Sequence, residues 1–293
     1  MDNWRFEGVT KAFEETTAID NITLEIEKNK IYGLIGRNGA GKTTLLKLLA
    51  SQLQPTRGVI KKGDAFLRHN DELTGQACLA RETINIKGIL NFNAQKIFTI
   101  ASRIYPKWDN DYCNRLIREF NLDIKKKYIK LSKGMHTVIG LIIGLAGRAP
   151  LTLFDEPYVG LDPVYRELFY ELLVDDYEKN PKTMVISSHL INELENLFER
   201  VLIIEQGKIL LNEDLETIKN KARIITGDRN ILEQVLKNKR VVHKQLTGRM
   251  AEYTVLDTLT EQELELFKQR DIDYSSIDLQ KLFVNLAKGV EKQ

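Results

Sequence analysis

Residues 36–44 carry the strongest chemical signal in the sequence. They read G-R-N-G-A-G-K-T-T and match the phosphate-binding pattern G-x-x-x-x-G-K-T. Glycine lets the backbone turn sharply and brings N–H groups close to an anion. Lys42 can reach the β- and γ-phosphates of a nucleotide, and the Thr43 hydroxyl can bind Mg²⁺. The alternative is a glycine turn before an ordinary helix. The phosphate site predicted here consists of Gly36, Arg37, Asn38, Gly39, Ala40, Gly41, Lys42, Thr43 and Thr44.

Two carboxylates and a histidine follow apolar segments farther along the chain. Leu151–Phe154 runs into Asp155 and Glu156, and Thr183–Ser188 runs into His189. A carboxylate at a strand end can hold Mg²⁺, and a second one beside it can polarise water for attack on a γ-phosphate. His189 can hydrogen-bond the same phosphate or water. The alternatives are an exposed acidic turn and a structural histidine.

Alternating strands and helices must bring these groups together. The runs 30–35, 151–155 and 183–189 are apolar in the manner of buried parallel strands, and a helical pattern follows Lys42. Ligands in open α/β sheets bind beyond the carboxyl ends of the strands. We therefore expect an α/β fold in which Asp155 and Glu156 lie beside the glycine loop.

The remaining segments predict further parts of the fold. Residues 1–30 alternate in hydrophobicity like a small antiparallel sheet, and Phe13 is predicted in the loop between its strands. Residues 84–120 read as mostly helical, and a buried helix capped by Ser132 runs to residue 146. The pattern changes near residue 220, which predicts a first domain over 1–220 and a small α+β subdomain over 221–293.

Composition excludes several classes of protein. The 293 residues include 43 basic and 41 acidic side chains, a net charge of +2, which argues against nucleic-acid binding as the main function. Cys78 and Cys113 form no C-x-x-C motif, so a reducing, cytosolic compartment is expected. No apolar run approaches the roughly 20 residues of a membrane span, so we expect a chain that is not itself integral to a membrane.

Together and in this order, the motifs resemble the ATP-binding subunit of an ABC transporter over residues 1 to about 220. In that resemblance, residues 36–44 are the Walker A loop, and 151–156 are Walker B with its catalytic glutamate. Residues 131–135, L-S-K-G-M, correspond to the LSGGQ signature. The remaining matches are the D-loop at Gly160-Leu161-Asp162, the switch histidine at His189, and Phe13 as the aromatic that stacks on adenine.

Two motifs depart from the family pattern. In the signature, Lys133 and Met135 replace the usual glycine and glutamine, while Ser132 and Gly134 remain. The L-S-K-G-M form resembles a bacterial subgroup of two-component exporters for peptides, antibiotics or lipids. The family also places a glutamine about 40 residues after the Walker lysine, where this chain has Glu82. The choice between Glu82 and Gln76 for that role stays open, with position favouring Glu82.

The resemblance implies the P-loop NTPase fold of ABC ATPases, with an antiparallel β subdomain, a helical subdomain at about 84–148 and the C-terminal α+β subdomain. It implies ATP and Mg²⁺ as cofactors, and it implies that Thr43, Asp155 and Glu82 bind the metal. Two chains would sandwich two ATP molecules, each chain lending its Ser132 and Gly134 to the other's nucleotide. The implied site also includes Glu156, His189, Phe13 and Asp162.

The function implied by the resemblance is that of an ATP-hydrolysing motor of a membrane exporter, whose cargo would be a small amphipathic molecule such as a peptide. Its partners would be an integral membrane permease and a second ATP-binding subunit, identical or different, with no nucleic acid. The chain would lie peripherally on the cytoplasmic face of the membrane. The alternative is a soluble ABC ATPase of translation or DNA repair.

Overall fold

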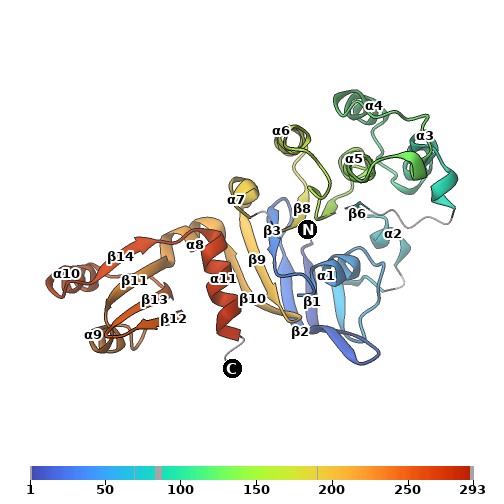
Figure 1. Ribbon diagram of the computed structural model, residues 1–293. Coiled ribbons are helices and arrows are strands. Elements are labelled where there is room, and N and C mark those ends of the chain that lie inside the picture. The colour runs from blue at the N-terminus through green and yellow to red at the C-terminus, as the bar shows by residue number, and fades with distance from the viewer. Residues whose placement is uncertain (1, 69, 83–87, 190, 291–293) are drawn as a thin grey trace. The chain divides into compact units, whose positions relative to one another are not determined.

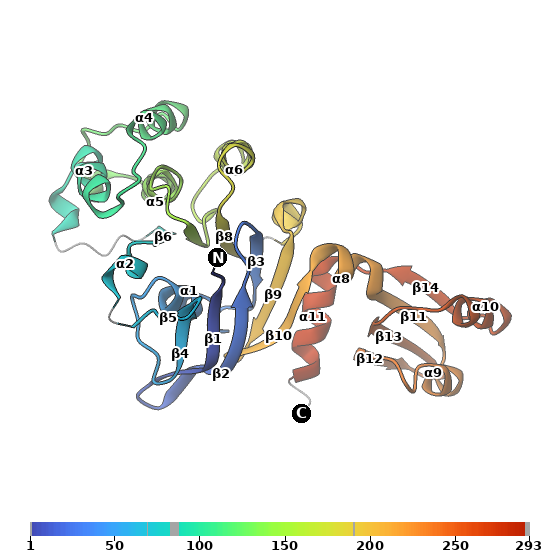
Figure 2. The ribbon, with the colours of Figure 1, turned by 180° about the vertical axis from the view of Figure 1, so that it is seen from behind.

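The computed structural model describes residues 2–68, 70–82, 88–189 and 191–290. Contacts divide the chain into two compact units, Met1–His189 with Ile204–Ile209, and Leu190–Ile203 with Leu210–Gln293. Figures 1 and 2 show the chain from opposite sides. This division groups residues 210–220 with the C-terminal unit, while the domain boundary expected at residue 220 stays a prediction.

Parallel strands form the centre of the first unit. In order across the sheet they are β3 (Ile31–Ile35), β8 (Thr183–Ser188), β7 (Leu151–Asp155) and β6 (Ala77–Arg81). Every residue of β3, β7 and β8 is buried, as expected of continuous apolar strands covered on both faces. The register sets Ile35 beside Ser188 and Asp155 beside Ser187. The polar strand ends therefore meet at one edge, where α1 (Lys42–Leu49) begins.

An antiparallel sheet forms the second part of this unit. Its strand order is β2-β1-β4-β5, with β1 (Trp4–Phe13), β2 (Thr16–Ile26), β4 (Arg57–Lys62) and β5 (Ala65–Phe66). The predicted loop position of Phe13 is wrong, because Phe13 is the last residue of β1 and pairs with Thr16. The strand continues this far because the turn is tight and Glu14 takes the left-handed conformation, with φ of 47°.

Helices form the third part of the first unit. Residues 84–87 of the predicted helical stretch lie outside the described residues, and the rest forms two helices separated at Pro106. Figures 1 and 2 show α3, α4 and α5 grouped together at one end of this unit. The elements are α2 (Asp71–Thr74), η1 (Ile89–Asn91), α3 (Ala94–Ile104), α4 (Asn110–Glu119), η2 (Tyr128–Lys130), α5 (Lys133–Ala146) and α6 (Pro163–Lys179).

The second unit contains a four-stranded antiparallel sheet of order β12-β13-β11-β14. The chain order strand–helix–strand–strand–helix–strand is the split β-α-β arrangement. β14 was not predicted, because all four of its residues are exposed and show no alternation. The elements are α7 (Ile191–Leu194), η3 (Glu195–Leu197), α8 (Leu215–Lys221), β11 (Ala222–Asp228), α9 (Arg229–Val235), β12 (Val241–Thr247), β13 (Met250–Leu256), α10 (Glu261–Gln269), β14 (Asp273–Ser276) and α11 (Leu279–Val290), while β9 (Arg200–Glu205) and β10 (Lys208–Asp214) contribute to both units.

Helices cover both faces of that C-terminal sheet. Tyr253 and Val255 belong to a core cluster with Leu232 of α9 and Phe267 of α10. Thr254 points to the opposite face, because side chains alternate along a strand. There its hydroxyl accepts a 2.7 Å hydrogen bond from the amide of Asn285 in α11. The predicted α+β subdomain thus has a core of its own.

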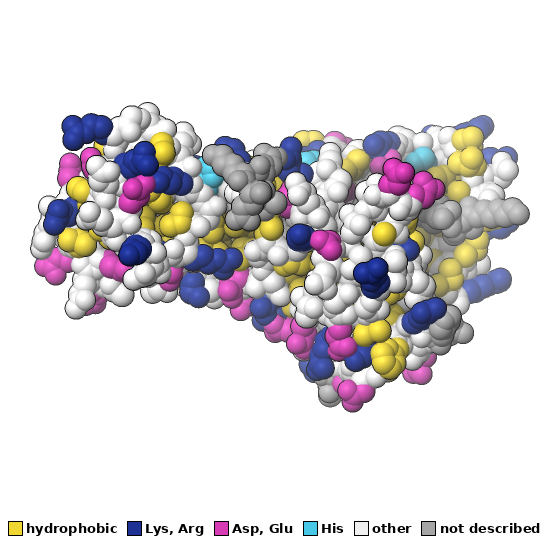
Figure 3. Space-filling model, turned by 90° about the horizontal axis from the view of Figure 1, so that it is seen from below, with side chains coloured by type: hydrophobic (Ala, Val, Ile, Leu, Met, Phe, Trp, Pro, Cys, Tyr) yellow, Lys and Arg dark blue, Asp and Glu magenta, His cyan; other side chains and the backbone are white. Residues whose placement is uncertain are grey.

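The molecular surface mixes charges of both signs. On the face drawn in Figure 3, basic and acidic side chains are interspersed, in keeping with 43 basic and 41 acidic residues. Among the described helices, none combines the length and the apolar character needed to cross a bilayer.

Candidate functional site

The glycine loop joins β3 to α1 through close backbone contacts. A Cβ on Gly36 would lie 2.5 Å from the carbonyl oxygen of Ile204, and one on Gly41 would lie 2.6 Å from that of Ala18. Gly41 also has φ of 111°, a conformation that side chains disfavour, and it precedes the first helical residue. These two positions therefore require glycine for the loop to lead directly into a helix N-terminus, where unpaired N–H groups favour anions.

Lys42 folds back over this loop. Its ammonium donates to the carbonyl oxygen of Gly36 at 2.7 Å and lies 3.4 Å from that of Arg37. It also forms an ion pair with the Glu156 carboxylate at 3.2 Å. Lys42 is buried, so its charge acts in a place of weak solvent screening. The structure thus joins the loop lysine to the second carboxylate at the end of β7.

Thr43 and Asp155 face each other at the same edge. The Thr43 hydroxyl donates to the two carboxylate oxygens of Asp155 at 2.9 and 3.2 Å. The Ser187 hydroxyl donates to Asp155 at 3.0 Å and accepts the amide of Glu156 at 2.9 Å. Sequence analysis missed Ser187 as part of the site. Its position at the carboxyl end of a buried strand, two residues before His189, was the available signal.

Glu156 lies between two basic side chains. One carboxylate oxygen contacts Lys42, and the other lies 2.7 Å from Nδ1 of His189. Glu156 has φ of 52°, the left-handed conformation, which turns its side chain away from the strand direction. His189 is exposed, whereas Asp155 is buried. The buried carboxylate therefore suits a metal or structural role, and the accessible Glu156–His189 pair suits contact with water.

The oxygen atoms of Thr43 and Asp155 fit a hard cation. A hydroxyl and a carboxylate are oxygen ligands of the kind that Mg²⁺ takes, together with water and substrate phosphates. No group of three His, Cys, Asp or Glu side chains suited to a metal occurs among the described residues. The pair thus fits a cation that is bound mainly through a nucleotide, rather than one enclosed by the protein.

The signature segment opens α5. The Ser132 hydroxyl caps the helix by accepting the Met135 amide at 3.3 Å, which confirms the predicted cap. A Cβ on Gly134 would lie 2.4 Å from the carbonyl oxygen of Gly160, so glycine permits close packing of these two segments. Within the described chain, no hydrogen bond or ion pair joins Ser132 or Gly134 to the glycine loop. Ser132 is exposed, so its hydroxyl and the helix N-terminus remain open to a second molecule.

Two of the residues that depart from the family pattern, Lys133 and Glu82, meet in the structure. The Lys133 ammonium lies 3.5 Å from the Glu82 carboxylate, and the Tyr128 hydroxyl donates to the Glu82 carbonyl oxygen at 3.0 Å. Gln76 instead accepts a hydrogen bond from Lys62. Glu82 follows β6, next to β7, while Gln76 precedes β6 at the opposite end. Glu82 thus lies at the carboxyl end of β6 and Gln76 at the other end, while the role of either residue at the site stays a prediction.

Asp162 and Phe13 have local structural contacts. Asp162 caps α6 by accepting the Tyr165 amide at 2.9 Å. Phe13 is 43% exposed at the end of β1, and the Lys11 ammonium lies 4.9 Å from its ring centre. An exposed ring has a face available for stacking, so Phe13 is not a core residue.

Comparison with known proteins agrees with this geometry. Residues 19–159 match the family described as ABC transporter. The ABC transporter ATP-binding protein YtrB of Bacillus subtilis is 29% identical over 218 residues, 73% of this chain and 72% of that protein. The lantibiotic transport ATP-binding protein SrtF of Streptococcus pyogenes is 28% identical over 74% of this chain and 93% of its own. The bacitracin transport ATP-binding protein BcrA of Bacillus licheniformis is 28% identical over 73% and 71%.

Solved structures agree on the fold. An ATP-binding subunit of an ABC transporter superposes with a TM-score of 0.65 at 22% identity, covering 74% of this chain and 92% of that one. A dimeric ATP-binding cassette in a post-hydrolysis state with ADP and phosphate gives 0.62 at 23% identity, covering 72% and 98%. The family match over residues 19–159, the relatives and the strand-end site agree, and together they identify an ATP-binding, ATP-hydrolysing domain like that of ABC transporters.

Proposed function

We propose that this subunit drives a membrane exporter of small amphipathic substrates such as peptides, by closing and reopening a pair of ATP-binding subunits. The observation that carries the chemistry is the position of Glu156, which contacts both Lys42 and His189 at the end of β7. Support for export comes from the similarity to ATP-binding proteins of lantibiotic and bacitracin transport.

In this proposal, residues 36–44 hold the phosphates of ATP and Glu156 polarises the attacking water. Lys42 turns from the Glu156 carboxylate toward the β- and γ-phosphates, which frees the carboxylate to accept a proton. His189, which contacts the other Glu156 oxygen, orients that carboxylate and donates to the γ-phosphate. Phe13 offers its exposed ring to the adenine base.

Mg²⁺ accompanies the nucleotide in this proposal. Thr43 and Asp155 supply the oxygen atoms, and Ser187 orients Asp155 through its hydrogen bond. Glu82 is the third residue assigned toward the metal, directly or through water. When bound, the cation neutralises charge on the phosphates as the bond to the γ-phosphate breaks.

A second subunit completes each site. Ser132 and Gly134 have no polar contact with the glycine loop of their own chain, and the exposed N-terminus of α5 is suited to a phosphate held by another chain. Asp162 caps α6 and lies two residues after Gly160, which packs against Gly134. In this proposal Asp162 also faces the partner subunit. ATP bound between the two subunits thus holds them together, and its hydrolysis lets them separate.

The membrane part of the machine would be a separate integral permease, which places this chain on the cytoplasmic face of the membrane. The helical segments within about 84–110 are assigned to the contact with that permease. A soluble ABC ATPase of translation or DNA repair is the alternative, and the similarity to transport proteins favours the exporter.

Replacing Glu156 by Gln tests the chemistry. The amide keeps the shape of the side chain but cannot accept the proton, so ATP binding should persist while turnover falls by about 100-fold or more. ATP with Mg²⁺ should then hold the variant as dimers in size-exclusion chromatography with light scattering. Glu167→Gln, an exposed site on α6, is the matched control and should behave like the parent. Normal hydrolysis by Glu156→Gln would remove Glu156 from the catalytic role.

Association with a permease tests the cellular role. The tagged chain, purified from its own cells in mild detergent, should carry an integral membrane protein with it. Cells that express the pair should tolerate more lantibiotic peptide than cells with the Glu156→Gln form. Recovery of ribosomes or DNA-repair proteins instead of a membrane protein would favour the soluble alternative.

A further inference from the structure

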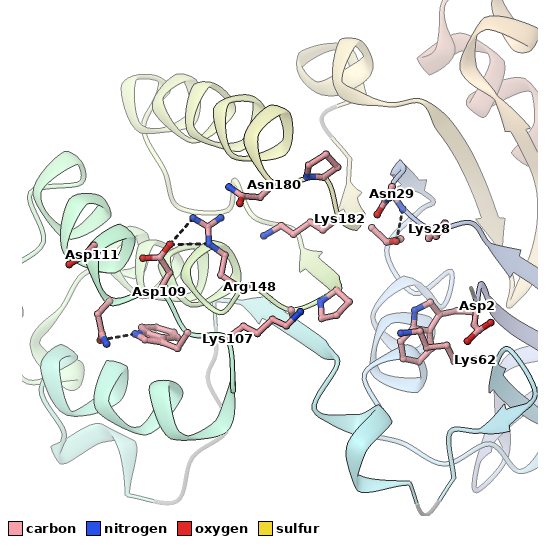
Figure 4. A pocket seen from close by; sticks show the side chains of 17 residues that line it. Asp2, Lys28, Asn29, Lys62, Lys107, Asp109, Asp111, Arg148, Asn180 and Lys182 are labelled. Carbon is pink, nitrogen blue, oxygen red and sulfur yellow. Dashed lines mark hydrogen bonds and ion pairs between the residues drawn. The ribbon is translucent and has the colours of Figure 1, made fainter.

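A second cavity lies in the first unit, away from the glycine loop. Its volume is about 980 Å³. Pockets that bind small molecules have volumes of about 300–1,000 Å³, so this cavity is large enough for one. Pro150 and Thr183, which line it, stand at the starts of β7 and β8, whereas Asp155 and Ser188 end those strands. Five residues of strand, about 16 Å, therefore separate it from the nucleotide site. Figure 4 shows Asp109, Arg148 and Lys107 on one side, Asp2, Lys28 and Lys62 on the other, and Lys182 between them.

Two of the cations in this cavity are matched by carboxylates. Arg148 donates to Asp109 at 3.0 and 3.2 Å and also to Asp176. The Lys182 ammonium lies 3.1 Å from Asp176, which is buried beneath the lining. Burial lowers the pKa of Lys182, and Asp176 partly opposes that effect. Asp109, Arg148, Asp176 and Lys182 thus form a chain of alternating charges that is neutral as a whole.

The other charged residues that line the cavity are three lysines and two carboxylates, namely Lys28, Lys62 and Lys107, and Asp2 and Asp111. Lys107 is exposed and has no hydrogen-bond or ion-pair partner within the described part of the chain. The pKa of Lys62 is lowered, mainly because the side chain is partly buried. The charge of Asp2 opposes this effect, and the positive charge of Lys107 adds to it. Lys62 and Lys107 therefore repel each other across a space that an anion would stabilise.

Both tryptophans of the chain line this cavity. Trp4 opens β1, and the Lys62 ammonium lies 5.4 Å from its ring centre. Trp108 precedes α4, and its indole N–H donates to Asn110 at 3.1 Å. Lys62 is thereby held above an aromatic face and also donates to Gln76, so it is restricted before any ligand arrives.

We propose that this cavity is a second ligand site, distinct from the ATP site, that binds a phosphate-bearing anion of small-molecule size between Lys62 and Lys107. Lysine ammoniums suit phosphate because they act as compact point charges that several oxygen atoms can share. The phosphate belongs to a soluble molecule or to a lipid headgroup, and both sources present the same group.

Tryptophan fluorescence reports on this site directly, because no tryptophan lies elsewhere in the chain. Inorganic pyrophosphate is titrated into the full chain carrying Lys42→Ala, which weakens the competing glycine-loop site. A saturable change is expected, and it should weaken as salt is added. Lys107→Ala in that background should lower the affinity about tenfold or more. Lys126→Ala, an exposed lysine outside the cavity, should leave it unchanged.

A variant that binds pyrophosphate more tightly shows that the cavity charges act on the ligand, because loss of structural support would weaken binding. Asp111→Asn removes a lining carboxylate, so it should tighten pyrophosphate binding. Vesicles containing phosphatidic acid distinguish a lipid headgroup from a soluble phosphate. If the ligand is a lipid, the chain should bind these vesicles through Lys107 even when pyrophosphate gives no signal. The proposal is overturned if neither probe gives a saturable signal, or if Lys107→Ala and Lys126→Ala bind equally well. Failure here would leave the ATP site untouched, since Glu156→Gln tests it separately.

Discussion

At the scale of single residues, the ion pair between Lys133 and Glu82 is the feature that sets this chain apart from its family's pattern. Both residues stand where the family has an uncharged one, and their charged groups lie 3.5 Å apart. Lys133 is 63% exposed and Glu82 is 29% exposed, so the pair adds little stability, about 0–1 kcal/mol. In the proposed function Glu82 also serves the metal, so Lys133 would compete with the cation for the Glu82 carboxylate.

Lys133→Gln should therefore lower the Mg²⁺ concentration at which ATP turnover is half maximal. Removing the ammonium frees Glu82 for the metal, and a weak surface pair corresponds to a shift of at most about fivefold. Steady-state ATPase assays over a Mg²⁺ series measure it. Lys130→Gln, an exposed lysine three residues earlier, serves as the control. An unchanged or higher Mg²⁺ requirement in Lys133→Gln would mean that Glu82 does not compete for the metal.

At the scale of elements, one buried carboxylate ties together several segments of the first unit. Asp176 of α6 contacts Arg148, which follows α5, and Lys182, which precedes β8. Arg148 also reaches Asp109, the cap of α4. Burial works to raise the pKa of Asp109, but hydrogen bonds from the Tyr112 amide and Arg148 lower it overall. The helices and the sheet are thus fixed to one another by charge as well as by apolar packing.

Asp176→Asn should destabilise the protein by about 3–5 kcal/mol, because it leaves buried cations without their full counter-charge. Urea denaturation followed by circular dichroism measures the loss. The neighbouring Asp175 offers a matched control, since it is 34% exposed where Asp176 is 1% exposed, and it pairs with surface residues. Asp175→Asn should cost about 1 kcal/mol or less. An equal loss of unfolding free energy in the two variants would show that burying Asp176 with its cations adds no stability over a surface pair.

At the scale of the whole molecule, the two cysteines report on global unfolding. Both are free and buried. Burial raises the pKa of Cys78 to about 11 and that of Cys113 to about 12. Both thiols therefore stay protonated near neutral pH in the folded chain, and the thiolate is the reactive form.

Iodoacetamide at pH 8 should leave the folded chain unlabelled over minutes, and it should modify both thiols in guanidinium chloride. Mass spectrometry counts the added groups. Because the folded pKa values are raised, labelling of the native chain should increase only as the pH approaches 11. Rapid labelling of Cys78 or Cys113 at pH 8 without denaturant would show that its segment opens far more readily than the rest of the fold.

Sequence patterns alone predicted the glycine loop, the buried strands and the carboxylates at their ends. Those features are local, because glycine spacing and continuous apolar runs encode backbone turns and burial directly. The cap at Ser132 and the α+β character of the C-terminal unit followed from equally local patterns. The strand end at Phe13 did not, because a tight turn through a left-handed Glu14 extended the hairpin beyond what alternation showed.

Which distant side chains meet depends on how the chain folds. Register alone sets Ser187 beside Asp155, and the crossing of separate segments pairs Lys133 with Glu82. The second cavity with its lysines likewise draws residues from many segments between 2 and 183. Pairings of this kind depend on strand order and chain crossings, which residue spacing does not record. For that reason the sequence predicted a phosphate site at residues 36–44, while the contacts of Glu156 with Lys42 and His189 required the folded chain.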